Sequence, residues 1–171
     1  MLQFILGGAR SGKSRYAEQI ALAQNLPVIY VATAQALDAE MQQRILHHQQ
    51  QRPADWSLVE SPLYLADELL KIDCEGQVIL VDCLTLWMSN LLLDVNSNTQ
   101  GLQCEKLLAV LPKLKSHVIL VSNETGLGVV PMGQLSRQFV DESGRLHQQI
   151  VQLADTVTFC VAGLPMQLKG E

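Results

Sequence analysis

The sequence carries a glycine-rich motif with a lysine and a terminal serine at residues 7–14, which read GGARSGKS. They satisfy the pattern G-x-x-x-x-G-K-[ST], which here follows a short apolar run and precedes a stretch of helical period. Glycines let successive backbone N–H groups curl toward a phosphate chain, and the start of a helix adds unpaired N–H groups. The pattern therefore predicts a phosphate-binding loop. Its members are Gly7, Gly8, Ala9, Arg10, Ser11, Gly12, Lys13 and Ser14.

A carboxylate at the end of a second apolar run, residues 78–81, adds a metal ligand to this loop. In sites that transfer phosphoryl groups, the loop lysine reaches the β- and γ-phosphates, while the loop hydroxyl and a carboxylate hold Mg²⁺. We therefore predict a catalytic role for Lys13, and Mg²⁺ binding by Ser14 and Asp82, with ATP or GTP as the nucleotide. The alternative for Asp82 is a cap on the helix that begins near residue 84.

A second group of reactive side chains lies in a stretch of helical period at residues 38–51, which ends before Pro53. At about 100° per residue, His48 falls on the apolar stripe with Ile45, whereas His47 does not. Imidazole is a nucleophile at neutral pH, so a histidine near a nucleotide can relay a nucleotidyl group. A histidine on an apolar face is also commonly a hydrogen-bonded core residue, and periodicity leaves both interpretations open.

Composition narrows the class of protein. Hydrophobic residues make up 48% of the 171 residues and charged residues 17%, which favours a sheet covered on both faces. A net charge of -5 without a run of Lys or Arg argues against a nucleic-acid partner. The longest apolar stretch, residues 84–93, is too short to span a bilayer of about 30 Å. The four cysteines lack metal-ligand spacing, so we expect reduced, mostly buried thiols in a cytoplasmic protein.

Two kinds of sequence pattern alternate along the chain. Short runs rich in Val, Ile and Leu alternate with longer stretches of helical period, which predicts a mostly parallel α/β sheet in one domain over residues 1–171. The expected strands are residues 2–6, 28–32, 58–59, 78–81, 118–121 and 157–161, with a short final strand after a turn at 163–166. The expected helices are residues 15–24, 38–51, 63–70, 84–93, 102–114 and 134–154.

Polar groups follow four of the expected strands, at residues 7–8, 33, 82 and 122–124. Because ligands of open α/β sheets bind at the carboxyl ends of the strands, we expect these groups to converge at one edge. Residues 94–101 and 125–133 are expected to be exposed loops. Gly144 is expected to loosen the last helix. That helix carries an apolar stripe of Leu135, Phe139, Leu146, Ile150 and Leu153.

An ordered series of motifs then points to one family. The motifs are GGARSGKS at 7–14, YVATA at 30–34, RILHH at 44–48 with RP at 52–53, VDCLTLW at 81–87, VSNE at 121–124 and GR at 144–145. Over essentially its whole length the chain resembles the bifunctional adenosylcobinamide kinase and adenosylcobinamide-phosphate guanylyltransferase family of cobalamin biosynthesis. The resemblance implies a P-loop NTPase fold of the RecA type, with helices on both faces of the sheet, and a homotrimer.

The resemblance also implies two reactions. A nucleoside triphosphate phosphorylates the aminopropanol hydroxyl of adenosylcobinamide, and GMP is then transferred from GTP to the adenosylcobinamide phosphate, giving GDP-adenosylcobinamide. By the R-I-x-x-H pattern, the guanylylated histidine corresponds to His48. Beyond the phosphate loop, the family's nucleotide-binding positions correspond to Thr33, Ala34, Gln35, Gln49, Gln50, Gln51, Arg52, Glu60 and Asp82.

Several residues keep two interpretations. Glu124 is either a general base for the hydroxyl or an anchor for the glycine-rich loop after it. Trp56, Trp87 and Met88 are favoured as core or subunit contacts over stacking platforms. His147 replaces the family's usual asparagine, either as a harmless change on a helix surface, which we favour, or as an alteration near the corrinoid. A kinase without guanylyl transfer, or a nucleotide-sensing module without turnover, would share the same phosphate loop.

Overall fold

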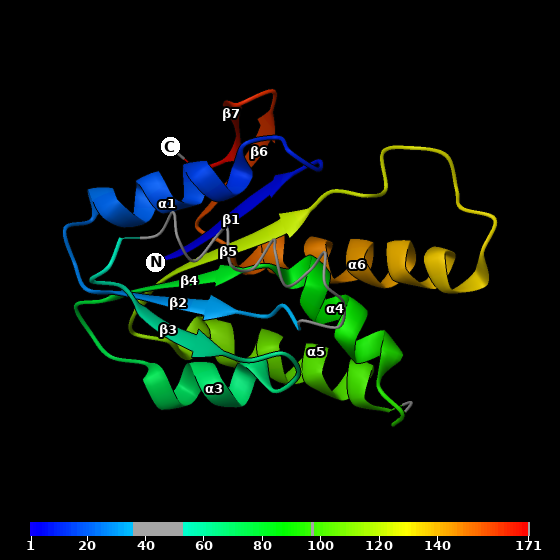
Figure 1. The fold of residues 1–171 in the computed structure, drawn as a ribbon, viewed down its shortest axis with the longest axis horizontal. Coiled ribbons are helices and arrows are strands. Elements are labelled where there is room, and N and C mark those ends of the chain that lie inside the picture. Colours follow the sequence, from blue (N-terminus) through cyan, green and yellow to red (C-terminus); the bar gives the residue numbers. More distant parts are fainter. Residues whose placement is uncertain (36–52, 97, 171) are drawn as a thin grey trace.

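The computed structural model describes residues 1–35, 53–96 and 98–170, in which strands and helices alternate (Figure 1). The strands are β1 (Leu2–Gly7), β2 (Val28–Ala32), β3 (Ser57–Glu60), β4 (Val78–Asp82), β5 (His117–Asn123), β6 (Thr156–Val161) and β7 (Leu164–Lys169). The helices are α1 (Lys13–Ala23), α3 (Leu65–Ile72), α4 (Leu84–Leu93), α5 (Thr99–Val110) and α6 (Gln134–Leu153), with a 3-10 turn η1 (Leu111–Lys113). The helix expected at residues 38–51 lies outside the described residues.

The strands form one sheet in the order β3-β2-β4-β5-β1-β6-β7. All pairs are parallel except β6 and β7, which pair antiparallel. The central strands β4 and β5 are buried along almost their whole length, as their continuous Val, Ile and Leu runs require of strands covered on both faces. The predicted mostly parallel sheet and the short final strand are therefore confirmed.

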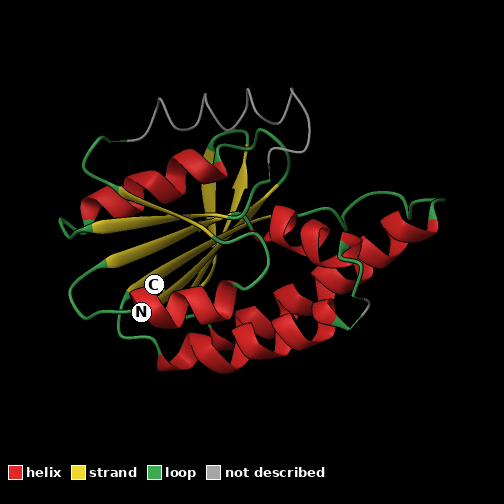
Figure 2. Ribbon diagram, turned by 60° about the horizontal axis from the view of Figure 1, so that its bottom comes forward, coloured by secondary structure: helices red, strands yellow, loops and turns green. Residues whose placement is uncertain are grey.

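Helices cover both faces of this sheet, with α1 on one face and α3, α4, α5 and α6 on the other (Figures 1 and 2). Successive residues of a strand point to opposite faces, so each strand supplies two cores. In β1, Phe4 and Leu6 join the core under α3 to α6, whereas Ile5 joins the core under α1. The second core is completed by two small residues of α1, Ala17 and Ala21, which allow that helix to lie close to the sheet.

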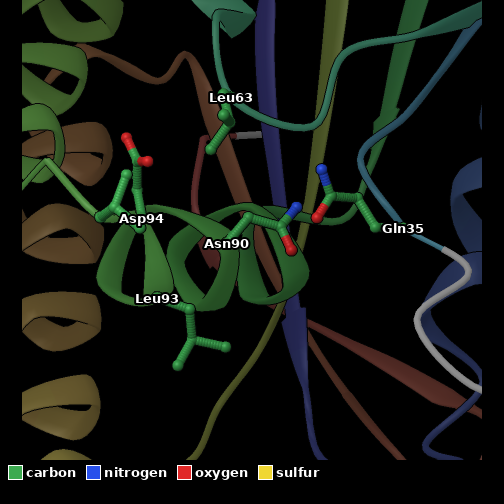
Figure 3. Close-up of a pocket in the computed structure, with 6 residues that line it drawn as sticks. Gln35, Leu63, Asn90, Leu93 and Asp94 are labelled. Atoms are coloured by element: carbon green, nitrogen blue, oxygen red, sulfur yellow. The ribbon is translucent and has the colours of Figure 1, made fainter.

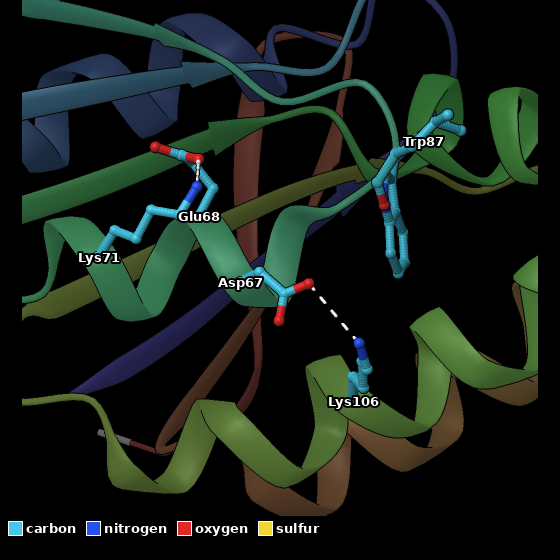
Figure 4. A network of polar contacts seen from close by, with 6 residues as sticks. Asp67, Glu68, Lys71, Trp87 and Lys106 are labelled. Atoms are coloured by element: carbon cyan, nitrogen blue, oxygen red, sulfur yellow. Dashed lines mark hydrogen bonds and ion pairs between the residues drawn. The ribbon is translucent and has the colours of Figure 1, made fainter.

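Helix α4 lies at the centre of the larger core. Trp87 and Met88 are fully buried there, and the Trp87 indole N–H donates to the carbonyl of Leu63 at 2.9 Å (Figure 4). Trp56 is half-buried and stacks on Tyr30 at a ring-centroid distance of 6.5 Å. All three side chains contribute to packing, which confirms the core interpretation over the stacking-platform one.

Two helices differ from the expectation. Helix α5 begins at Thr99, inside the expected loop at residues 94–101, because a turn closed by the Thr99 N–H and the Asn96 carbonyl (2.9 Å) leads directly into it. Helix α6 runs through Gly144 without a break. Its apolar stripe is only partly buried, since its first turns extend beyond the sheet (Figure 1) and leave Leu135 half exposed.

Candidate active site

The polar strand ends meet at one edge of the sheet, as predicted. Gly7 at the end of β1 pairs with Asn123 at the end of β5, and Ala32 at the end of β2 pairs with Asp82 at the end of β4. Strand β5 lies between β4 and β1. The phosphate loop, the β5 end and the Asp82 carboxylate therefore form a row across the carboxyl edge.

The phosphate loop has the backbone shape that the glycines were expected to allow. The Ser11 N–H donates to the Gly8 carbonyl at 3.2 Å, and Gly12 has a φ of 89°, a left-handed conformation that favours glycine. Helix α1 then begins at Lys13, and no side chain caps it. The N–H groups of its first turn are therefore available to an anion.

The turn between β6 and β7 braces this loop from the side. The Gly163 N–H donates to the Ser11 carbonyl at 2.9 Å. A Cβ on Gly12 would lie 3.1 Å from the Gly163 Cα, and a Cβ on Gly7 would lie 2.7 Å from the Cys160 carbonyl oxygen. Sequence reasoning expected a turn near residue 163 but missed this contact, because the turn and the loop are about 150 residues apart and share no motif.

Lys13 and Asp82 both act on the Cys83 thiol at the sheet edge. The Lys13 ammonium donates to the Gly8 carbonyl at 3.3 Å. Burial raises the pKa of the Cys83 thiol to about 11, the neighbouring Asp82 carboxylate acts in the same direction, and the Lys13 ammonium opposes it. Cys83 is thus a protonated thiol at neutral pH.

Among the described residues, the Asp82 side chain does not cap the helix that follows it. The N-cap of α4 is Cys83, with no side-chain cap hydrogen bond, so the alternative of Asp82 as the cap is wrong. The peptide bond between Asp82 and Cys83 is cis. Residues 78 and 80 of β4 pack under α1, so the strand alternation places residue 82 on that same face, where the phosphate loop enters α1.

The donor set at this edge fits Mg²⁺. Ser14 and Asp82 supply a hydroxyl and a carboxylate oxygen, and a phosphate-site Mg²⁺ completes its shell with waters and phosphate oxygens rather than with a protein cage. The described residues contain no cluster of three or more His, Cys, Asp or Glu side chains suited to a metal.

Thr33 is fully buried at the end of β2. Its hydroxyl donates to the Cys83 carbonyl at 2.7 Å and accepts from the Cys83 N–H at 3.0 Å. Its own carbonyl accepts from the Asn90 side chain at 2.8 Å, and that amide also donates to the carbonyl of Pro62 at 3.0 Å. The Thr33 side chain therefore joins two strand ends, so a nucleotide contact at this position would come from the neighbouring Ala34 or Gln35.

Gln35 lines a pocket at the same edge, together with Asn90 of α4 (Figure 3). The remaining lining residues are Leu63, Leu93, Asp94 and Val95. The pocket thus combines apolar walls with two amide side chains, and Asn90 was not among the predicted nucleotide-binding residues.

Glu60 lies at the opposite side of the edge. It is the last residue of the outer strand β3 and is exposed. Four strand spacings of about 4.8 Å separate β3 from β1, so Glu60 is about 19 Å across the sheet from the strand that carries the phosphate loop. A nucleotide whose phosphates lie on the loop would reach Glu60 only with its far end.

A hydrogen-bonded chain behind β5 was not expected from the sequence. The Asn123 N–H donates to the Thr85 hydroxyl at 2.6 Å, this hydroxyl lies 3.3 Å from that of Ser122, and the Ser122 hydroxyl lies 2.9 Å from Nε2 of His147. His147 is 7% exposed, and its ring meets that of Phe4 edge-on at 5.4 Å. The prediction of a harmless helix-surface position for His147 is therefore wrong.

The predicted apolar stripe of α6 includes Leu146 but not His147. The structure buries both, because α6 lies between β1 and α4. Burial lowers the pKa of His147, although the Glu124 carboxylate acts in the opposite direction, so the ring is neutral at neutral pH.

Glu124 makes the contact expected of a loop anchor. Its carboxylate accepts from the Gly126 N–H at 2.5 Å, and its own N–H donates to the Gly7 carbonyl at 3.1 Å. The described loop beyond it is exposed, as predicted. Glu124 therefore joins the glycine-rich loop to the phosphate-loop strand, while its role as a base stays a prediction.

The residues predicted to carry guanylyl transfer lie outside the described part of the chain. These are His48, with His47 and Arg44, and the nucleotide-binding positions Gln49, Gln50, Gln51 and Arg52.

The fold and the loop define a P-loop nucleotide-binding protein of the α/β class. A profile of the family described as cobinamide kinase / cobinamide phosphate guanyltransferase matches residues 3–168. The chain belongs to this family, and it is an enzyme with these two activities, as the sequence resemblance implied. Membership excludes the nucleotide-sensing module and the kinase without guanylyl transfer.

Named relatives support the assignment over full length. The bifunctional adenosylcobalamin biosynthesis protein of Pseudomonas aeruginosa is 56% identical over 171 residues, which cover 100% of this chain and 99% of that protein. The protein of the same description from Escherichia coli is 37% identical over 183 positions, covering 99% of this chain and 100% of the relative.

Solved structures share the fold at low identity. A protein of Pyrococcus horikoshii matches with a TM-score of 0.58 at 8% identity, covering 99% of this chain and 86% of that one. A DnaB-like replicative helicase matches with a TM-score of 0.51 at 16% identity, covering 92% of this chain and 46% of the helicase. At such identities the likeness shows the fold alone. None of the described helices is long and apolar enough to cross a membrane.

Proposed function

We propose that the phosphate loop binds ATP or GTP for the kinase reaction, with Lys13 on the β- and γ-phosphates. The observation that carries this proposal is the uncapped start of α1 behind a left-handed Gly12, next to a carboxylate at the end of β4. The hydroxyl of adenosylcobinamide attacks the γ-phosphorus, the bond from that phosphorus to the β–γ bridging oxygen breaks, and the nucleoside diphosphate leaves. The hydroxyl proton passes to a base, for which Glu124 is the candidate.

Ser14 and Asp82 would hold Mg²⁺ beside the phosphates. When bound, the ion neutralises the charge that develops on the transferred group. The protein side chains contribute position: Lys13 fixes the phosphate chain, and the first-turn N–H groups of α1 hold its oxygens.

The second reaction uses His48 as a nucleophile in this proposal. An imidazole nitrogen attacks the α-phosphorus of GTP, and pyrophosphate leaves. A phosphate oxygen of adenosylcobinamide phosphate then attacks the same phosphorus, which breaks the phosphorus–nitrogen bond and forms GDP-adenosylcobinamide. The residues proposed to bind these nucleotides are Ala34, Gln35, residues 49–52 and Glu60.

Labelling with GTP that carries ³²P at the α-phosphorus tests the histidine. We expect an acid-labile, base-stable label on the wild-type protein and on His47→Ala, and none on His48→Ala, while phosphorylation of adenosylcobinamide persists in both variants. A label retained by His48→Ala would show that another residue carries the guanylyl group.

We also propose that the chain works as one cytoplasmic domain that assembles as a homotrimer. Strands from both ends of the chain pair in one sheet, which supports a single domain. The segment between β5 and α6 stands away from the body (Figure 1) and carries exposed apolar side chains, which supports burial by another subunit. These side chains are Leu127, Val129, Val130 and Met132. Analytical ultracentrifugation should give three times the mass of the chain; a monomer would contradict the assembly.

A further inference from the structure

The buried chain behind β5 has a free polar group at its active-site end. Oδ1 of Asn123 is buried and has no hydrogen-bond partner among the described residues. A buried amide oxygen without a partner is costly unless a ligand or water satisfies it. Its position at the carboxyl edge makes a substrate donor the natural partner.

Strand alternation places this side chain on the ligand side of the sheet. Ile119 and Val121 of β5 pack under α1, so residue 123 points to the same face. By the same alternation Asp82 of β4 is on that face, and Gly7 of β1 pairs with Asn123. Asn123 therefore lies between the proposed magnesium ligand and the phosphate loop.

The opposite face of β5 holds the backbone that presents Asn123. Ser122 is 1% exposed and lies under α4 and α6, between the Thr85 hydroxyl at 3.3 Å and the His147 ring at 2.9 Å. Only the first link has a fixed direction: the Asn123 N–H donates to Thr85 at 2.6 Å. His147 is also held by its edge-on contact with Phe4, so the His147 end of the hydrogen-bonded series is anchored in the core.

We propose that Asn123 orients the hydroxyl of the phosphoryl acceptor through its amide oxygen, and that His147 is a positioning residue that fixes Asn123 through Ser122 and Thr85. This inference rests on the kinase reaction proposed above. Neither residue takes or gives a proton in it: the amide accepts the hydrogen bond of the hydroxyl while the acceptor is placed, the hydroxyl turns this hydrogen to the base as its oxygen attacks, and His147 acts without touching substrate.

The hydrogen-bonded series from His147 to Asn123 predicts a specific pattern of kinetics. Removal of the imidazole in His147→Ala leaves Ser122 free to rotate, so we expect kcat for adenosylcobinamide phosphorylation to fall about tenfold, since misplacement of a positioning group acts on the chemical step. The KM for the nucleotide should stay within about twofold of wild type, because Lys13 and the phosphate loop are not part of the hydrogen-bonded series from His147 to Asn123. Asn123→Ala should lower kcat further.

A matched set of variants separates positioning from loss of stability. His147→Asn, which restores a short hydrogen-bonding side chain, should recover most of kcat, and Ser122→Ala combined with His147→Ala should be no worse than either alone. Ile150 is fully buried on the same helix but takes no part in the hydrogen-bonded series. We therefore expect Ile150→Ala to lower the melting temperature, while kcat measured well below that temperature stays unchanged.

Each result has one meaning. A kcat of His147→Ala within twofold of wild type, an equal loss in Ile150→Ala, or no recovery in His147→Asn would overturn the inference while leaving the kinase intact. Absence of turnover in the wild-type protein would instead overturn the proposed function together with the inference.

Discussion

At the scale of single residues, charge and burial decide which side chains are available for chemistry. Cys83 lies beside the proposed site, but its burial and the Asp82 carboxylate keep its pKa near 11, so it is not a nucleophile at neutral pH. Lys13 and Asp82 are the charged groups whose fields act on this thiol. The thiol serves instead as a small apolar side chain under α1.

His147 gives the residue scale a pH prediction. Its pKa in the folded protein lies below the ordinary 6.5 because burial disfavours the imidazolium, so the unfolded chain binds a proton that the folded one does not as the pH falls below about 6.5. The free energy of unfolding should therefore fall on acidification through that range. Urea unfolding at pH 7.5 and 5.5 should show a larger loss for wild type than for His147→Asn; equal losses would contradict a neutral, buried imidazole.

At the scale of elements, the junction between α3 and β5 depends on one carboxylate. Asp73, just after α3, accepts from the N–H of Lys115 at 3.0 Å, the N–H of Ser116 at 2.9 Å and the Ser116 hydroxyl at 2.7 Å. Burial on its own would raise the pKa of Asp73, but these hydrogen bonds outweigh it and the pKa is lowered. The carboxylate therefore ties the end of a helix to the start of a central strand.

Replacement of this carboxylate should destabilise the protein. We expect Asp73→Ala to lower the free energy of unfolding by about 2 kcal/mol at pH 7, because hydrogen bonds to a charged group are lost. Since the folded pKa is lowered, the contribution of Asp73 is present above about pH 4 and is lost as the pH falls through the folded pKa. Urea unfolding measures both effects.

Asp67→Ala is the matched control for that prediction. Asp67 pairs with Lys106 at 3.6 Å between α3 and α5 (Figure 4), and both side chains are more than two fifths exposed. An ion pair so exposed contributes less than about 1 kcal/mol. Equal costs for the two variants would show that the Asp73 hydrogen bonds add nothing beyond surface charge.

At the scale of the whole molecule, sequence periodicity predicted most of the fold. The apolar run at residues 78–81 was recognisable as a strand, because a strand covered on both faces is apolar at every position. The burial of β4 agrees with that pattern. The orientation of His147 was predicted wrongly, because the packing of α6 between a strand and another helix has no local signal. The start of α5 was also predicted wrongly, because a local turn closed by the Thr99 N–H and the Asn96 carbonyl leads into the helix earlier than expected.

The site also has features that the sequence predicted and features that it did not. The phosphate loop and Asp82 were recognisable because phosphate binding demands glycines, a lysine and a carboxylate at fixed places in a strand–loop–helix unit. The brace from Gly163 and the chain from His147 to Asn123 join residues that are distant in sequence, through backbone atoms and hydroxyls common in any protein. Only the folded chain brings them together.

Calorimetric titration with GTP in the presence of Mg²⁺ shows whether the loop at residues 7–14 holds the triphosphate. We expect binding by the wild-type protein, at least tenfold weaker binding by Lys13→Ala, and wild-type affinity for Lys71→Ala, whose exposed lysine pairs with Glu68 on α3. No binding by the wild-type protein, or equal affinity for Lys13→Ala, would contradict this role of the loop.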